Sequence, residues 1–374
     1  MTTDTHTFPP TDVRRVLIIM PQLLGDLVLA TALITALKAR APRCQIDVLA
    51  HPRSGGLLDC HPHIDRLFLL DATWRHKGLL RTLGPRLRLV RAMRRHPYDL
   101  LIQSPHTTDG SWGPALITLL RIPRAVGAHA SVHGSPVKRF FWKQTFTHML
   151  PRPHPRQGPR HTGDLHLDLL RRVGIHPDAH ERRPCIVPDT AAETRIDRLL
   201  RELALQAKGF LLFAPTAGAT GKFLDPVMAR TLARRLADNG ETLLVTAAPG
   251  PRDEGYVRDM VHGLPRVHNL AGTLSLLELA ALARRAECFI GTDSGTMHIA
   301  AAMGTSVIAC FGPGDDILFG PWQTPARIIA MPWPCRPCYA NGCGDGGVSD
   351  CLAALSPEAV LSALTDIRRH TSGT

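Results

Sequence analysis

The sequence predicts an α/β protein with two doubly wound parallel-sheet domains of the Rossmann type. Three observations support this fold class. The chain has 374 residues, which exceeds one average domain and is enough for two separate cores. Apolar runs of strand length alternate with helical patterns along the whole chain, as in α/β folds. Small, polar turns follow several of these runs, at the sheet edge where ligands of open α/β sheets bind.

The first half contains the strands and helices of one such sheet. The loop from Pro21 to Asp26 leads from the first strand into a helix that ends near Arg40, and an Arg-rich helix covers residues 81–95. Residues 131–163 are dense in His, Pro and Arg without periodicity, which predicts a mobile flap over this domain. The expected strands are residues 16–20, 46–50, 67–70 and 100–103, with 126–127 as a further edge.

The second half repeats the pattern after a linker at residues 174–189, which is rich in Pro and charge. Its last helix is expected to begin at Pro357, with Ser356 as N-cap. We therefore predict a first domain at 1–184, a second at 185–355, and a C-terminal helix and tail at 356–374 that could cross back to the first domain. The expected strands are residues 210–214, 242–246, 267–269, 288–291 and 306–311.

The formal net charge of +12 lies entirely in the first half. Residues 1–170 contain 23 Lys and Arg against 11 Asp and Glu, whereas the remaining residues balance. This asymmetry predicts an anionic partner for the first half, such as an acidic substrate or membrane surface, although a merely solvated basic surface is the alternative. Nucleic acid is not expected, because no zinc-finger, RRM or KH pattern is present and aromatic residues are few.

Hydropathy and cysteine usage favour a cytoplasmic protein. No apolar stretch reaches the roughly 18 residues of a membrane-spanning helix, and Asp26 interrupts the first apolar run too early for a signal peptide. The chain has nine cysteines without a secretory signal, so disulfides are not expected.

The turn after residues 288–291 is the most informative motif. A buried strand runs into Asp293-Ser294-Gly295-Thr296 and then into an Ala-rich helix that closes on Gly304. A helix N-terminus offers unpaired N–H groups and partial positive charge, so it suits a phosphate, while Asp293 and His298 add an acceptor and a donor for a sugar. The alternative is an ordinary turn in which Asp293 or Ser294 is only an N-cap.

A second loop with phosphate-binding character follows residues 210–214. Residues 215–222 are small or hydroxyl-bearing and end in Lys222, whose ammonium could bind a diphosphate. A Walker A loop would need Gly at 216 and Ser or Thr at 223, but the chain has Thr216 and Phe223, which disfavours a P-loop NTPase. A surface loop with a solvated Lys is the alternative.

Asp26 stands where the first strand's loop meets its helix. A carboxylate there could accept a proton from an attacking hydroxyl, or it could only complement the helix dipole. A dinucleotide enzyme would need a Gly-x-Gly-x-x-Gly turn at this point, and only Gly25 is present, which counts against a dehydrogenase.

Four late cysteines form the only dense cysteine cluster in the sequence, in a Pro- and Gly-rich segment. Their spacing is compatible with a structural zinc site but irregular for the common zinc modules, so free thiols or a redox-sensitive pair are the alternative. They are Cys335, Cys338, Cys343 and Cys351.

Six motifs in register give the chain a family resemblance from about residue 14 to 367. They are Leu24-Gly25-Asp26, the Lys222 loop, Asn269-Leu270-Ala271-Gly272-Thr273, Asp293-Ser294-Gly295 with His298, Phe311-Gly312-Pro313, and the late cysteines ending in Cys351-Leu352. Together they resemble glycosyltransferase family 9, the ADP-heptose:lipopolysaccharide heptosyltransferases. Two departures stand out: Phe223-Leu224-Asp225 after the Lys looks more like the third core heptosyltransferase group, and Gly314 stands where Thr or Ser is usual.

The resemblance implies a GT-B fold, in which two Rossmann-like domains face a cleft, the first binding the acceptor and the second the nucleotide sugar. It implies an inverting reaction with Asp26 as base, Lys222 and the 294–296 turn on the diphosphate, Asp293 on the sugar, and no metal requirement for catalysis. The predicted donor residues are Thr216, Thr220, Gly221, Lys222, Thr273, Leu274, Asp293, Ser294, Gly295, Thr296 and His298. The expected acceptor contacts are Arg121, Arg124, Lys138, Arg139 and Lys143.

These features together predict a cytoplasmic glycosyltransferase, peripheral to the inner membrane and its anionic surface. It would move heptose from ADP-heptose to a sugar hydroxyl of the lipopolysaccharide core. The alternatives are another nucleotide sugar on the same scaffold, or a non-catalytic protein that binds nucleotide sugars or anionic glycans.

Overall fold

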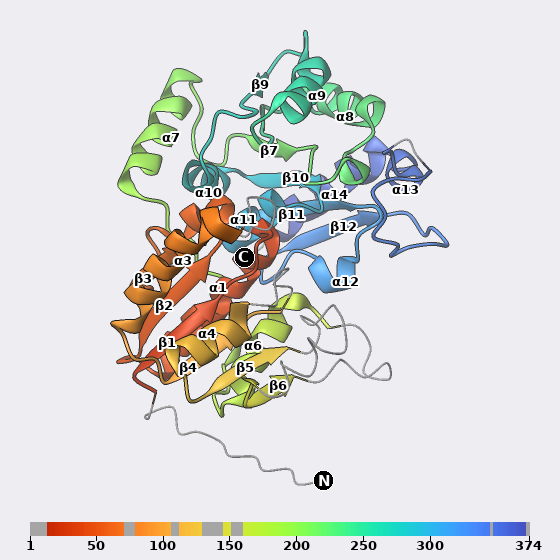
Figure 1. Cartoon of the computed structure of the whole chain (residues 1–374). Coiled ribbons are helices and arrows are strands. Elements are labelled where there is room, and N and C mark those ends of the chain that lie inside the picture. The colour runs from red at the N-terminus through yellow and green to blue at the C-terminus, as the bar shows by residue number, and fades with distance from the viewer. Residues whose placement is uncertain are drawn as a thin grey trace. The chain divides into compact units, whose positions relative to one another are not determined.

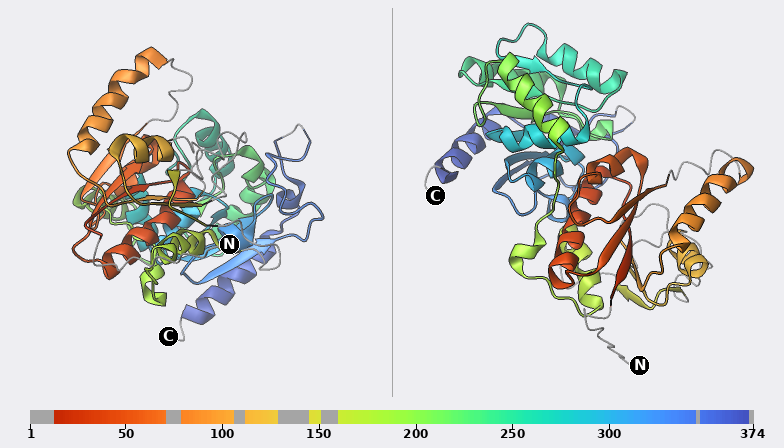
Figure 2. Two further views of the ribbon diagram at one scale, coloured as in Figure 1. Left: turned by 60° about the horizontal axis from the view of Figure 1, so that its bottom comes forward. Right: turned by 90° about the vertical axis from the view of Figure 1, so that its left-hand side faces the viewer.

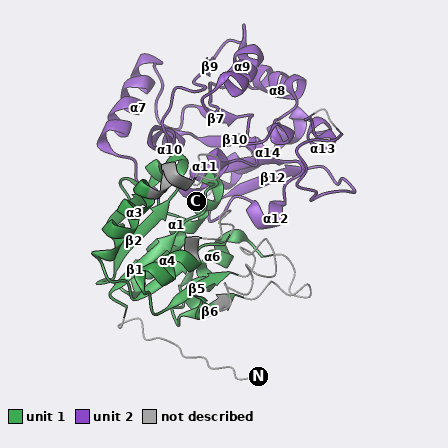
Figure 3. Cartoon of the chain, viewed as in Figure 1, with its two compact units in different colours: residues 1–185 green, residues 186–374 purple. Residues whose placement is uncertain are grey.

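The computed structural model describes residues 13–70, 79–105, 112–128, 145–150, 160–344 and 347–371. The chain divides into two compact units, residues 1–185 and 186–374 (Figure 3). The division falls inside the expected linker. Among the described residues, no helix is both long and apolar enough to cross a membrane.

The first unit is built on a six-stranded parallel sheet with the order β3-β2-β1-β4-β5-β6. Its strands β1, β2, β4 and β5 are mainly buried because helices lie on both faces: α1 and α6 on one, α3 and α4 on the other (Figures 1 and 2). The strands are β1 Arg15–Ile19, β2 Gln45–Ala50, β3 Arg66–Leu69, β4 Leu100–Gln103, β5 Ala125–Ala128 and β6 His148–Leu150. The helices are α1 Leu24–Arg40, α2 Pro52–Gly55, α3 Leu79–Arg94, α4 Trp112–Leu120 and α6 Thr162–Arg172, with 3-10 turns η2 Gly56–Leu58 and η6 Ala179–Arg182.

The second unit repeats this topology in the order β12-β11-β10-β7-β8-β9. Helices α8, α9 and α14 pack on one face of its sheet. The strands are β7 Leu211–Ala214, β8 Leu243–Val245, β9 Val267–Asn269, β10 Cys288–Thr292, β11 Ser306–Phe311 and β12 Ala326–Ala330. The helices are α7 Thr190–Glu202, α8 Pro226–Asp238, α9 Pro251–Val261, α10 Leu276–Arg285, α11 Gly295–Ala302, α12 Asp316–Phe319, α13 Asp350–Ala353 and α14 Pro357–Thr371, with the 3-10 turn η7 Thr220–Lys222.

Local sequence explains where the helices of the second unit begin. Asp225 caps α8 by accepting hydrogen bonds from Val227 N and Met228 N, both at 3.0 Å, with Pro226 at the first helical position. Ser275 and Glu278 form a reciprocal capping box at α10. Each cap fixes the point at which the chain leaves the sheet edge.

Two features of the fold differ from the sequence prediction. The strand at 126–127 is not an edge, because the three-residue β6 pairs outside it. The edge strand β12 was not expected. The final helix α14 packs in the second unit, where Val360, Leu364 and Ile367 join its core. Much of the expected flap, at 131–144 and 151–159, lies outside the described residues.

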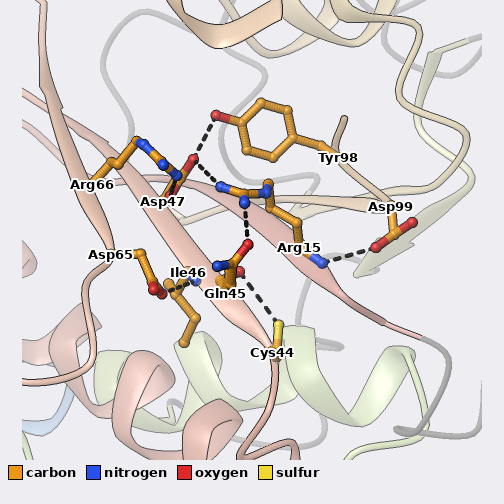
Figure 4. A network of polar contacts seen from close by, with 9 residues as sticks. All are labelled: Arg15, Cys44, Gln45, Ile46, Asp47, Asp65, Arg66, Tyr98 and Asp99. Carbon is orange, nitrogen blue, oxygen red and sulfur yellow. Dashed lines mark hydrogen bonds and ion pairs between the residues drawn. The ribbon is translucent and has the colours of Figure 1, made fainter. Parts of the chain in front are cut away.

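A buried ion network closes the amino edge of the first sheet (Figure 4). The fully buried Asp47 Oδ2 accepts from Tyr98 Oη at 2.9 Å and from Arg15 at 3.2 Å, and Arg66 lies 3.7 Å from its Oδ1. Burial and the Asp47 charge raise the pKa of Tyr98. Because a buried charge is costly unless it is paired, Arg15, Arg66 and Tyr98 offset the burial of Asp47. The network lies at the opposite edge of the sheet from the carboxyl ends of its strands.

Candidate active site

Both sheets have a topological switch point, where the strand order reverses between the first and fourth strands. In the first unit this point lies between β1 and β4, and in the second between β7 and β10. Ligands of open α/β sheets bind at the carboxyl ends of strands at such points. The predicted residues Asp26, Lys222 and Asp293 all follow strands that border one of the two.

Lys222 and Asp293 meet directly in the second unit. Lys222 ends η7, the turn after β7, and Asp293 follows β10. The Lys222 Nζ lies 2.5 Å from Asp293 Oδ2, and the side chain of Asp293 is 9% exposed against 31% for Lys222. The carboxylate is thus largely enclosed while the ammonium remains partly open to a ligand.

Gly314 explains why this pair fits. A Cβ atom at Gly314 would lie 2.3 Å from Asp293 Oδ2 and 3.7 Å from Lys222 Nζ. Any side chain at this position would displace the Asp293 carboxylate or its partner. The resemblance marks Gly314 as a departure from the usual Thr or Ser, and in this chain a side chain at that position would meet the Asp293 carboxylate.

The turn after β10 has the geometry of an anion site. Ser294, not Asp293, is the N-cap of α11, and its Oγ accepts from Met297 N at 3.4 Å. Gly295 and Thr296 are the first two residues of α11, so their N–H groups have no acceptor within the helix. His298 is buried in the same helix, with 3% exposure. Ser294 is thus an N-cap, as one reading of the sequence expected, and the N–H groups that the other reading assigned to an anion lie in the same turn.

The other predicted donor residues lie at the same carboxyl edge. Thr216 is buried after β7, and its carbonyl accepts from Thr292 Oγ1 at 3.4 Å. Thr273 and Leu274 follow β9, with the Thr273 hydroxyl donating to Leu270 O at 2.9 Å. Glu254 packs against this turn: its carboxylate would be 2.3 Å from a Cβ at Gly272, and it accepts from Gly250 N at 2.8 Å.

Asp26 occupies the corresponding place in the first unit. It is the third residue of α1, directly after the β1 loop, and is 6% exposed. The α1 N-cap, Leu23, supplies no side-chain hydrogen bond. Asp26 is the only acidic residue in the first turn of this helix. Its position is compatible both with a base and with a residue that complements the helix dipole.

The structure does not bring the described acceptor candidates, Arg121 and Arg124, to Asp26. Arg121 and Arg124 precede β5, and the Arg124 carbonyl accepts from Leu101 N near the start of β4. They therefore lie toward the amino edge, whereas Asp26 follows the carboxyl end of β1. Lys138, Arg139 and Lys143 lie outside the described residues.

The late cysteines are neighbours but do not form a closed ligand set. Desolvation raises the pKa of Cys335, and the nearby thiols of Cys338 and Cys343 raise it further. Burial likewise raises the pKa of Cys351, followed by the effect of Cys343. Over the described ranges, three or more potential ligand atoms converge within 4.8 Å only at Asp178, His180 and Glu181. Zinc at the cysteines stays a prediction.

That acidic group is already occupied by a cation of the chain itself. Arg40, at the end of α1, lies 2.5 Å from Asp178 Oδ2 and 2.9 Å from Glu181 Oε2. Its role is therefore structural, joining α1 to the end of the first unit.

Comparison with known proteins assigns the family. The model of "Glycosyltransferase family 9 (heptosyltransferase)" matches residues 176–348. Lipopolysaccharide heptosyltransferase 3 of Escherichia coli is 30% identical over 305 residues, covering 80% of this chain and 82% of the relative.

Solved structures share the fold over nearly the whole chain. A family 9 glycosyltransferase from Veillonella parvula has a TM-score of 0.78 at 20% identity, covering 96% of this chain and 98% of that one. An E. coli heptosyltransferase solved with ADP-2-deoxy-2-fluoro heptose has a TM-score of 0.70 at 18% identity, covering 94% and 99%. The predicted GT-B fold class is confirmed, and this chain belongs to glycosyltransferase family 9 and is a glycosyltransferase.

Proposed function

We propose that this protein transfers heptose from ADP-heptose to a sugar hydroxyl of the lipopolysaccharide inner core, with inversion at the anomeric carbon. The observation that carries the proposal is the Lys222–Asp293 pair, 2.5 Å apart, at the β7/β10 switch point beside the N-terminus of α11. A cation, a helix N-terminus and a carboxylate together suit a diphosphate joined to a sugar. The names of the relatives support the heptosyl donor and the lipopolysaccharide acceptor.

The donor diphosphate would lie between Lys222 and the turn Ser294-Gly295-Thr296. Lys222 would exchange its contact with Asp293 for the phosphate oxygens, and the Asp293 carboxylate would then accept a hydrogen bond from a sugar hydroxyl. The adenosine would lie toward Thr273 and Leu274. Lys222 and the α11 N–H groups would stabilise the charge that develops on the departing ADP.

Asp26 would act as the general base on the acceptor. Its carboxylate takes the proton from the acceptor hydroxyl while the hydroxyl oxygen bonds to the anomeric carbon of heptose. The bond between that carbon and the β-phosphate oxygen breaks on the opposite face, and ADP leaves with the electron pair. One displacement of this kind inverts the anomeric configuration.

The basic first half would bind the acceptor and the anionic face of the inner membrane from the cytoplasm. Phosphates and acid-sugar carboxylates of the core carry the matching charge. Because Arg121 and Arg124 lie toward the other edge, we do not assign them to the acceptor site at Asp26. Lys138, Arg139 and Lys143 stay the predicted acceptor contacts.

Transfer is tested by incubating the protein with ADP-heptose and a heptose-deficient inner-core acceptor, and by measuring released ADP and the mass of the product. We expect ADP release that requires the acceptor, a product heavier by one heptose, and an inverted anomeric configuration by NMR. Parallel reactions with ADP-glucose and UDP-glucose test the donor. Transfer from another nucleotide sugar alone, or binding of ADP-heptose without transfer, would contradict the proposal.

A further inference from the structure

The segment that carries the late cysteines, residues 335–351, is hydrogen-bonded to the loop that presents Lys222. Asn341 Oδ1 accepts from Gly221 N at 2.9 Å and from Thr220 Oγ1 at 3.3 Å. Ser349 Oγ donates to Gly221 O at 2.5 Å in a buried position. Both main-chain polar groups of the residue before Lys222 are therefore held by this segment.

The two backbones also touch at this point. A Cβ atom at Gly221 would lie 2.2 Å from Gly342 N and 2.4 Å from the carbonyl carbon of Asn341. Only glycine allows so close an approach, so the cysteine segment limits where the Gly221 backbone can lie. The next residue, Lys222, then reaches Asp293 Oδ2.

The same segment also contacts the turn that follows β11. Cys338 N and Tyr339 N both donate to Pro313 O, at 3.2 and 2.9 Å. Arg336 Nε donates to Gly312 O at 2.6 Å. Pro313 precedes Gly314, the residue packed against Asp293. Residues 335–351 therefore support both loops that surround the Lys222–Asp293 pair.

We propose that Asn341 is a positioning residue that fixes Lys222 for the donor diphosphate. This inference rests on the proposed function, because it assumes that Lys222 binds ADP. Asn341 need not touch the nucleotide. Its amide oxygen accepts two hydrogen bonds from the loop tip. Without them only Ser349 would hold Gly221 by a side-chain hydrogen bond, and the looser loop would let Lys222 shift away from Asp293.

The test is the ADP dissociation constant of Asn341→Leu, measured by calorimetry. Leucine keeps the volume but removes the acceptor, and we expect the dissociation constant to rise about fivefold, the usual effect of losing a partly buried hydrogen bond. The KM for the donor should rise while the KM for the acceptor stays constant. A general loss of structure would change both constants. Asn239→Leu, at the exposed C-cap of α8, is the matched control.

Two further variants show whether Asn341 acts through Lys222. In a Lys222→Ala background, Asn341→Leu should change ADP affinity by less than about twofold, because the group that it positions is gone. Asn341→Asp keeps an acceptor and should retain most of the affinity. If Asn341→Leu does not fold, Asn341→Ala removes the same acceptor without adding an apolar side chain at this exposed position and should weaken binding to a similar degree.

The possible results separate this inference from the proposed function. Unchanged ADP affinity in Asn341→Leu, or an equal loss with and without Lys222, would overturn the positioning role while leaving the function intact. A wild-type protein that does not bind ADP would overturn both.

Discussion

Asp26 is the residue on which the proposed proton transfer depends. Changing it to Asn removes the basic oxygen while keeping the size of the side chain. We expect Asp26→Asn to lower kcat by a factor of about 10² to 10⁴ and to leave ADP affinity nearly unchanged. Asp59→Asn, at an exposed position directly after η2 in the same unit, is the control. Near-normal turnover of the Asp26→Asn enzyme would contradict the general-base role and would favour an Asp26 that only complements the dipole of α1.

His61 predicts how stability depends on pH. The ring is 5% exposed, and burial, followed by the charge of His63, lowers its pKa to about 4. Because the unfolded chain keeps an ordinary pKa near 6.5, only the unfolded state binds a proton between these values. The contribution of His61 to stability is therefore fully present above pH 6.5 and is lost as the pH falls toward 4.

Urea unfolding at pH 7 and pH 5 checks this expectation. The contribution of His61 to the free energy of unfolding should fall by roughly 2 kcal/mol between the two. In His61→Phe, the free energy of unfolding should fall by about 2 kcal/mol less between pH 7 and pH 5 than in the wild type. His176→Gln, at an exposed position, should show the wild-type fall. An equal loss in His61→Phe would show that other groups cause the acid sensitivity.

Among the elements, the strands of the two sheets were largely predictable because buried parallel strands are short apolar runs bounded by turn residues. β4, β9 and β11 have the expected bounds. β6 and β12 were missed because an edge strand needs no such pattern: β12 is partly exposed. Asn341 could not be found from the sequence, since it meets Gly221 from 120 residues away in a segment without periodicity.

The cysteine segment predicts a link between metal content and the donor site. Protein purified without chelator should contain about one zinc per chain if Cys335, Cys338, Cys343 and Cys351 bind it. Because Asn341 lies between the second and third of these cysteines and holds the Lys222 loop, removing the metal should also weaken ADP binding. Metal-free protein with four freely titrating thiols and normal ADP affinity would favour the free-thiol alternative.

At the scale of the whole molecule, charge predicts a division of labour between the two units. The +12 surplus lies in residues 1–170, and the remainder is neutral. Surface attraction is screened within about 8 Å at physiological salt, so acceptor or liposome binding should fall as salt rises. ADP binding depends on close, partly buried contacts and should respond less.

Reversal of Lys138 and Arg139 to Glu tests the same division without changing the salt. The acceptor KM should rise while ADP affinity remains constant. Reversals that disturbed ADP binding and spared the acceptor would show that the first unit does not serve the acceptor.

The assignment of the donor site depends most on Lys222, which the sequence singled out and the structure places 2.5 Å from Asp293. Calorimetric titration of ADP into wild-type protein and Lys222→Ala tests it directly, with Lys208→Ala, before the start of β7, as the matched control. The account predicts that Lys222→Ala weakens ADP binding by roughly 2 kcal/mol, the scale of a charge-assisted contact, and that the control does not. Equal ADP affinity in wild type and Lys222→Ala would contradict the proposed diphosphate site.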